Sequence, residues 1–458
     1  MNLTLGALLA YLFLQLILCY LISKKIKSED DYLVGGRNSG YILISLSLFA
    51  TWFGAETCIG SSAEVFKHGL SGSRADPLGY SLCLIFTGLL IAPKIWNKKY
   101  VTLADFYKER FGSQAEKLSV LILSFSALIW SAAQLRAFGQ VLSTVTNWPV
   151  EAAVFLSFVF VLAYVLFGGL LGDIITDAVQ SVVIAFGLFL IFYFVFKQSD
   201  QGFLGLISDQ SPERLSLKGE SESLLSRVDR WMIPVLGSLV SQEIISRIFA
   251  SKNKSVAVRS SYISGLIYIF IGLIPVSLGL VGPNLINVPS GQEEQFILIL
   301  AESSLPLFFI PIFFGAIVSA LLATIDSILL SSSGLISHNL VIPRLQISSE
   351  KKKVFISRLV VFLCGLLSYI LAIYSESIYS LLEMASSFGT SGILIITILG
   401  LWFSFGNSKT ASFTLLSGLI LTPLFEHIIK LEAPFVSSIL MCGLVYLSHS
   451  VYLKFKEN

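Results

Sequence analysis

Small and hydroxyl-bearing side chains recur along the stretch Ala320–Gly334, which reads ALLATIDSILLSSSG. The members at positions i, i+3, i+4, i+7 and i+11 are Ala320, Ala323, Thr324, Ser327 and Ser331. This spacing puts them on one face of a helix. Hydroxyl oxygens suit a hard cation such as sodium, whereas a face of small side chains would otherwise serve close packing against another membrane helix.

Asp326 lies at the edge of the same face. A carboxylate in the middle of a membrane helix is costly to bury and by default indicates function. Its presence favours an ion site over a face used only for packing. Carbonyl oxygens freed by an unwound neighbouring helix would complete such a site.

Few other ionisable side chains fall inside apolar runs, and Arg136 lies deep in the run 118–145. The set includes Glu56, Glu64, Asp76, Arg136, Asp173, Asp177, Glu243, Asp326 and Glu383. We expect Arg136 to have an anionic partner, for which Glu56 and Asp76 are candidates. A structural ion pair and direct contact with a substrate both remain open, since arginine also clamps carboxylates through two hydrogen bonds.

The composition places these residues in a membrane protein. The chain has 458 residues, of which 55% are hydrophobic and only 13% charged, with a mean hydropathy of +0.81. Soluble proteins carry about 25% charged residues. A net charge of +2 provides no basic field for nucleic acid. The five cysteines and four histidines show no metal-ligand spacing, which argues against a zinc site or a disulfide framework.

Apolar runs long enough to span a membrane need about 20 residues, and about thirteen occur in what we interpret as one transporter domain, 1–458. They are 3–23, 41–66, 74–96, 118–145, 149–167, 173–197, 230–250, 257–282, 298–338, 353–374, 378–403, 409–428 and 434–453. The first run lacks a preceding basic region and a cleavage site, so we interpret it as a helix rather than a signal peptide.

Lysine and arginine gather in alternate loops, such as 24–40, 97–117 and 341–353. Cytoplasmic loops are enriched in these residues. We therefore predict a multi-pass protein of the cell (inner) membrane with its N-terminus outside and its C-terminus in the cytoplasm. The polar loop 198–229 would lie outside.

Two of the runs are interrupted by polar residues and helix breakers. The segment 45–57 contains Gly54, and the segment 231–250 contains Pro234 and Gly237. Unwound backbone at membrane depth is tolerated where it lines a cavity. Two such segments in corresponding positions indicate an inverted-repeat transporter, although two ordinary kinked helices are the alternative.

The implied organisation consists of two repeats and flanking helices. The predicted segments are an extra N-terminal helix 1–24, repeats 41–197 and 230–403, and C-terminal helices 409–458.

Five motifs in order resemble the sodium:solute symporter family over about Asp31 to Leu340. They are Asp31–Arg37, Ala50–Thr57, Gly168–Leu170 followed by Thr176–Gln180, Ser241–Glu243 with Arg247–Lys254, and the 319–334 stretch. The resemblance implies an all-α, LeuT-like fold of two inverted five-helix repeats with broken first and sixth core helices. It also implies sodium-coupled import of a small solute by alternating access.

The resemblance further implies two ion positions. The main sodium site would use the carbonyls of Ala50, Phe53 and Ala320 with the side chains at 323 and 324. Ala323 departs from the family, which usually has a hydroxyl there, so Thr324 is left as the side-chain ligand. A second ion site would combine Asp177, Thr324, Asp326 and Ser327, and either sodium or a proton would suit it.

Within the family the motifs are most similar to choline transporters, which surround a quaternary ammonium with aromatic rings. Trp52, Tyr80 and Trp130 match three of those rings, and Ser241 stands where a fourth, a tryptophan, is expected. Desolvated cation–π attraction amounts to about 2 kcal/mol. An amino acid, a zwitterion or a carboxylate is the alternative substrate. The residues expected around the substrate are Trp52, Glu56, Thr57, Asp76, Tyr80, Trp130, Gln134, Arg136, Ser241 and Gln242.

Other classes of protein fit the sequence less well. An enzyme would need a nucleophile with a base or a metal cluster, and no such grouping of residues occurs. A channel or a membrane sensor is a remote alternative. The coupling ion is expected to be Na⁺, with no organic cofactor. The expected partners are a small-molecule solute and membrane lipid but no nucleic acid, and the protein is expected to be a monomer or a loose homo-oligomer.

Overall fold

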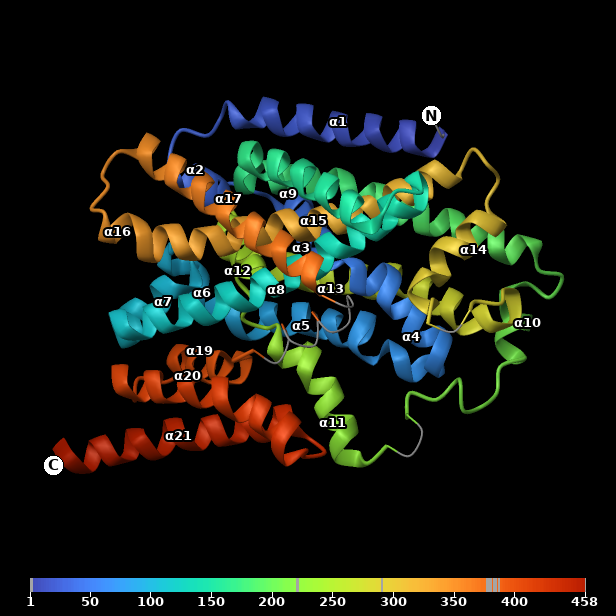
Figure 1. Ribbon diagram of the computed structural model, residues 1–458. Helices are drawn as coiled ribbons and strands as arrows, with labels where there is room; N and C mark the ends of the chain where they lie inside the picture. The colour runs from blue at the N-terminus through green and yellow to red at the C-terminus, as the bar shows by residue number, and fades with distance from the viewer. Residues whose placement is uncertain are drawn as a thin grey trace.

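The computed structural model describes residues 3–219, 222–289, 291–375, 381, 385 and 388–457. Within these ranges the regular structure is helical and contains no strand, which confirms the all-α prediction. Figure 1 shows the helices packed into one bundle.

The helices of the first part run from the N-terminus to the polar loop. They are α1 (Leu3–Ser23), α2 (Glu29–Val34), η1 (Gly35–Arg37), α3 (Tyr41–Trp52), η2 (Glu56–Gly60), α4 (Ser61–His68), η3 (Gly69–Ser73), η4 (Arg74–Gly79), α5 (Tyr80–Phe86), η5 (Thr87–Ile91), α6 (Ala92–Ile95), η6 (Trp96–Lys98), α7 (Leu103–Phe111), α8 (Ser113–Thr146), α9 (Val150–Gln198) and α10 (Gly202–Ser208).

The second part begins after the polar loop. Its helices are α11 (Leu224–Met232), η7 (Ile233–Gly237), α12 (Gln242–Ala250), α13 (Lys254–Leu285), η8 (Glu293–Gln295), α14 (Phe296–Ser304), α15 (Ile310–Ile336), η9 (Ser337–Val341), α16 (Ile342–Arg344), α17 (Glu350–Tyr374), α19 (Thr390–Trp402), α20 (Ser408–Pro423), η10 (Leu424–Ile429) and α21 (Pro434–Glu457).

The predicted count of thirteen spans is not confirmed. Among the described residues nine helices are long and apolar enough to cross a membrane, or ten if one bent pair is counted. One reason is that α9 contains two predicted runs, which meet at Gly169 with φ 54°. Another is that α3 and α19 are too short by themselves, with 12 and 13 residues.

Both predicted interruptions are present. Helix α3 ends at Trp52, and Phe53 leaves helical geometry with φ −87° and ψ 68°. The other break lies between η7 and α12. The axes of the segments Leu224–Gly237 and Gln242–Ala250, on either side of this break, differ in direction by 41°. The first and sixth core helices are therefore broken as expected. The boundaries of the two repeats stay a prediction.

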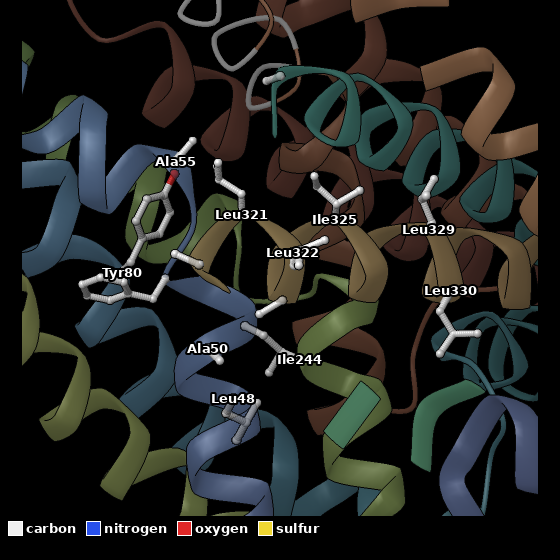
Figure 2. Packing of buried hydrophobic residues seen from close by; sticks show 14 of the residues in the cluster. Leu48, Ala50, Ala55, Tyr80, Ile244, Leu321, Leu322, Ile325, Leu329 and Leu330 are labelled. Carbon is white, nitrogen blue, oxygen red and sulfur yellow. The ribbon is translucent and has the colours of Figure 1, made fainter. Parts of the chain in front are cut away.

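Helix α15 lies at the centre of the bundle and packs against α9, α8, α17, α3 and α1. Almost every residue from Pro311 to Leu335 is buried. Small residues permit this close packing: a Cβ at Gly187 of α9 would lie 2.3 Å from the Ala316 Cβ. Figure 2 shows apolar side chains of α15, such as Leu322 and Ile325, together with Leu48 of α3 and Ile244 of α12.

The two termini lie at opposite ends of the bundle (Figure 1). Helices α2, α7 and α16 gather at the end near the C-terminus, and α10 and α14 at the end near the N-terminus. Helices α19, α20 and α21 pack together as a separate layer on one side. This arrangement positions α15, α3 and α12 around the middle of the bundle, where the predicted sites lie.

The polar loop between α10 and α11 is fastened to the bundle by buried charges. Arg74 of η4 donates to Glu222 at 2.5 Å, and both side chains are buried. Burial raises the pKa of Glu222, but the hydrogen bond and charge of Arg74 outweigh this effect and hold its pKa below the ordinary value. Arg214 donates to the carbonyls of Phe66 and Leu280. Among the described residues of the loop, Arg214 and Glu222 therefore hold it against the helices of the bundle.

Candidate functional site

The helices predicted to form the main sodium site meet at the break after α3. Ala50 and Phe53 at the end of α3 are fully buried, as are Ala320 and Ala323 of α15. The Thr324 hydroxyl donates to the Ala320 carbonyl oxygen at 3.1 Å. It also lies beside the break, because a Cβ built at Gly54 would be 2.8 Å from Thr324 Oγ1.

The predicted second ion site lies within a cluster of three buried carboxylates. Asp173 and Asp177 of α9 and Asp326 of α15 each place an oxygen within 4.8 Å of the others. Ser327 joins them, since its hydroxyl is 3.2 Å from both carboxylate oxygens of Asp173. Thr324 was predicted here too, but its hydroxyl is directed to the Ala320 carbonyl instead.

A buried arginine that the site prediction missed occupies this acidic cluster. Arg247 of α12 is 0% exposed, and its Nη2 lies 2.6 Å from Asp173 Oδ2 and 3.1 Å from Asp177 Oδ2. Its Nε donates to Ser47 Oγ of α3 at 3.1 Å. Because Arg247 falls inside the predicted run 230–250, the rule that singled out Arg136 would have found it.

The charges of the cluster do not balance. Three carboxylates face one guanidinium, and Asp177 Oδ1 and Asp326 Oδ2 are buried without a hydrogen-bond partner. Uncompensated charge is expensive to bury. The arrangement therefore favours the uptake of further positive charge.

A cavity of about 80 Å³ lies beside the break, large enough for several water-sized molecules. Trp52, Tyr80 and Trp130 line one part of it, as predicted from the choline-transporter resemblance. The centroids of Trp52 and Trp130 are 6.3 Å apart in a stacked pair, and Tyr80 lies edge-on to Trp52 at 6.0 Å. The three rings therefore form one aromatic wall.

Polar residues of α12 and α15 complete the lining of the cavity. Ser241 and Gln242 were predicted here, whereas Thr324, which was predicted for the ion sites, and Glu243 are additions. Gln242 is already occupied, since its Oε1 accepts from the Leu103 amide at 2.8 Å. Among the described lining residues Glu243 is the one carboxylate, and none is basic.

Five residues predicted for the substrate cavity do not line it. They are Glu56, Thr57, Asp76, Gln134 and Arg136. Glu56 is bound to Gln134 instead of lining the cavity: Gln134 Nε2 donates to both oxygens of the Glu56 carboxylate at 2.7 Å. Gln134 in turn accepts from the Ala55 amide at 2.9 Å. These two side chains thus hold the broken segment to α8.

Asp76 and Thr57 belong to a second hydrogen-bonded cluster, together with Tyr268. The Thr57 hydroxyl donates to Asp76 Oδ2 at 2.7 Å, and the Tyr268 hydroxyl lies 3.1 Å from the same oxygen. Tyr268 also donates to the Trp52 carbonyl at 3.1 Å. Through Tyr268, these contacts hold the backbone of Trp52, and so one ring of the aromatic wall, in position.

The predicted pairing of Arg136 with Glu56 or Asp76 is wrong for the described residues. Arg136 donates instead to the Ala372 carbonyl of α17 at 2.8 Å. Both carboxylates take neutral hydrogen-bond donors. Glu383, also expected at membrane depth, lies outside the described residues.

A bundle of membrane helices with two broken segments around a central cavity is the architecture of a secondary active transporter. A model of the sodium:solute symporter family matches residues 32–418. The chain belongs to the sodium:solute symporter family, and its relatives and fold are those of transporters rather than enzymes.

Individual relatives agree with this assignment. The high-affinity choline transporter 1 of Drosophila melanogaster is 27% identical over 374 residues, which cover 78% of this chain and 59% of the relative. The sodium-coupled monocarboxylate transporter 2 of Bos taurus is 25% identical over 429 residues, 88% and 68% of the two chains. The chain spans about three fifths of the length of the choline transporters it matches.

The fold is that of a solved symporter. A substrate-bound, outward-open Na⁺-coupled sialic acid symporter superimposes with a TM-score of 0.85 at 18% identity, over 98% of each chain. This match establishes the LeuT-like architecture.

Proposed function

We propose that the protein is a sodium-coupled symporter that imports a small organic cation of the choline type by alternating access. The observation that carries this proposal is the aromatic wall of Trp52, Tyr80 and Trp130, which shares one cavity with Thr324. Aromatic faces attract quaternary ammonium groups. Membership of the family supports sodium as the coupling ion.

The charge of the cavity favours a cation over a carboxylate. Glu243 is its one charged side chain among the described residues. Arg136, which would be needed to clamp a carboxylate, donates to the Ala372 carbonyl and is absent from the lining. The likeness to a monocarboxylate transporter keeps carboxylates, zwitterions and amino acids as outcomes of the test.

We assign the coupling ion to the main site at the break. Its ligands would be Thr324 and the carbonyls of Ala50, Phe53 and Ala320, while Ala323 offers no side-chain oxygen. Because Thr324 also lines the cavity, an ion held there would stabilise the same state that receives the solute. Coupling requires no more than this shared preference.

The acidic cluster is our candidate for a second cation position. The ligand oxygens would come from Asp177, Asp326 and Ser327. Asp173 would serve as the fourth ligand, the role predicted for Thr324 from the sequence. Arg247 already supplies one positive charge there. A second positive charge, as sodium or a proton, would reduce the remaining imbalance.

We further infer that the N-terminus lies outside and the C-terminus in the cytoplasm of the cell (inner) membrane. Support comes from the positions of the termini at opposite ends of the bundle (Figure 1) and from the basic loops. The repeats 41–197 and 230–403 would move relative to each other around the central cavity.

A panel of thermal unfolding curves tests the substrate. The full chain in detergent is heated with choline, betaine, an amino acid or a monocarboxylate, each in sodium or potassium chloride. A ligand at 100 times its Kd stabilises the folded state by about 2.7 kcal/mol. We expect stabilisation by choline or betaine that requires sodium. Stabilisation by the amino acid or the monocarboxylate alone would overturn the cation assignment.

A further inference from the structure

Three side-chain oxygens from three helical segments converge on Gly54, directly after the break in the first core helix. A Cβ built at this glycine would lie 2.8 Å from Thr324 Oγ1, 2.9 Å from Gln134 Oε1 and 2.9 Å from Glu56 Oε2. All three oxygens therefore border one small space. Glycine leaves that space open, whereas any larger residue would fill it.

Each of the three oxygens retains the capacity to bind a cation. Thr324 gives its proton to the Ala320 carbonyl, which leaves the lone pairs of its oxygen available. Gln134 Oε1 accepts a single hydrogen bond, from the Ala55 amide. Glu56 receives the neutral amide of Gln134, and no basic side chain in the described part of the chain pairs with it.

We propose that Glu56 and Gln134 are ligands of the coupling ion, together with Thr324. This inference rests on the proposed sodium-coupled function and adds two side chains to its ion site. Sodium is a hard cation that takes oxygen ligands. The carboxylate of Glu56 replaces the hydroxyl that Ala323 lacks, and the ion neutralises a charge that is otherwise costly at membrane depth.

The position of these ligands connects the ion to the solute cavity. Gln134 follows Trp130 by four residues in the continuous helix α8, so both lie on one face. Thr324 borders both the space at Gly54 and the cavity. An ion bound by Glu56, Gln134 and Thr324 holds α8 and α15 to the broken segment, directly behind the aromatic wall.

Sodium binding to the full chain in detergent tests this site without any solute. Thermal unfolding is followed as sodium chloride replaces potassium chloride at constant ionic strength. We expect Glu56→Gln to raise the sodium concentration needed for half-maximal stabilisation at least tenfold, which corresponds to about 1.4 kcal/mol. Glu64→Gln is the matched control, because Glu64 is a half-exposed acid farther along the same segment. It should leave the sodium response within twofold of the wild type.

An exchange of the two side chains guards against a simple folding defect. The double variant Glu56→Gln/Gln134→Glu keeps the shapes and the mutual hydrogen bond but moves the carboxylate across the space. We expect it to recover much of the sodium affinity lost in Glu56→Gln.

The outcomes separate this inference from the function on which it rests. If the wild type is stabilised by sodium and Thr324→Ala weakens the effect, while Glu56→Gln keeps wild-type affinity, the two added ligands are refuted and the symporter proposal stands. If Glu56→Gln loses affinity and the exchange variant folds but recovers none, Glu56 acts only on structure and the inference is also overturned. If the wild type itself shows no sodium response, the proposed function fails.

Discussion

Replacing Arg247 with glutamine is predicted to destabilise the protein strongly, because this side chain neutralises a buried acidic cluster. Its Nη2 lies 2.6 Å from Asp173 Oδ2 and 3.1 Å from Asp177 Oδ2, and none of the residue is exposed. The Arg247→Gln variant leaves three carboxylates with oxygens within 4.8 Å of one another and no fixed cation between them.

The size of the effect follows from the burial of the pair. Removal of one partner of a fully buried ion pair costs about 3–5 kcal/mol, since the other charge stays buried and uncompensated. Arg247 also donates to Ser47 Oγ at 3.1 Å, which ties α12 to α3. We therefore expect a loss in the free energy of unfolding of about 3–5 kcal/mol for Arg247→Gln.

Reversible unfolding in mixed micelles measures this free energy, and a double-mutant cycle identifies its origin. Arg247→Gln combined with Asp173→Asn removes one positive and one negative charge together. If Arg247 acts by neutralisation, the double variant should be more stable than Arg247→Gln alone, with a coupling of about 1–3 kcal/mol. A loss below about 1 kcal/mol for Arg247→Gln, or additive effects of the two changes, would show that Arg247 does not neutralise the cluster.

The remaining predictions concern the cavity, the ion and the outer loop. Trp130→Leu should weaken choline binding by up to about 30-fold, the equivalent of about 2 kcal/mol of cation–π attraction, as measured by the choline dependence of thermal unfolding; equal choline affinity would rule out the aromatic wall. Asp177→Asn should weaken sodium stimulation of uptake less than Thr324→Ala, and the reverse order would move the main ion to the acidic cluster. Glu222 has a folded-state pKa below its ordinary value of about 4.3, so its stabilisation is complete above that pH and lost as the pH falls through the lower folded-state value. Proteolysis of the loop 198–229 should therefore increase at acidic pH in the wild type, while Glu222→Gln should be cleaved faster at neutral pH and respond less to acid.

The features that sequence alone could predict are those that depend on local chemistry. Helical spacing placed Thr324 and Ser327 on one face, and the structure buries both in α15. Gly54, Pro234 and Gly237 weaken a helix wherever they occur, and both predicted breaks are present. The family resemblance added Trp52, Tyr80 and Trp130, which do share one cavity.

The partners of buried charges could not be predicted in the same way, because they depend on contacts between distant segments. Arg136 was expected to meet Glu56 or Asp76, yet its guanidinium donates to Ala372, 236 residues away. Glu56 was expected in the substrate cavity and instead receives the amide of Gln134. No periodicity within one helix specifies which neighbouring helix supplies a donor.

Hydropathy also limited the count of spans. A window of apolar residues detects two runs in α9 because the apolar stretch exceeds one span, but it says nothing of the turn at Gly169 between them. It likewise joins α3 to the segment after the break in one predicted run, 41–66, although the 12 residues of α3 are too short to span alone. The broken helices that hold the site are therefore the elements for which span counting is least informative.

Uptake into proteoliposomes measures directly whether a sodium gradient drives the import of choline. The purified chain is reconstituted, and labelled choline is offered under an inward sodium gradient or an equal potassium gradient. We expect accumulation above equilibrium with the sodium gradient alone, and loss of that accumulation in Thr324→Ala. Equal uptake under both gradients, or sodium-driven uptake that Thr324→Ala leaves unchanged, would contradict this expectation.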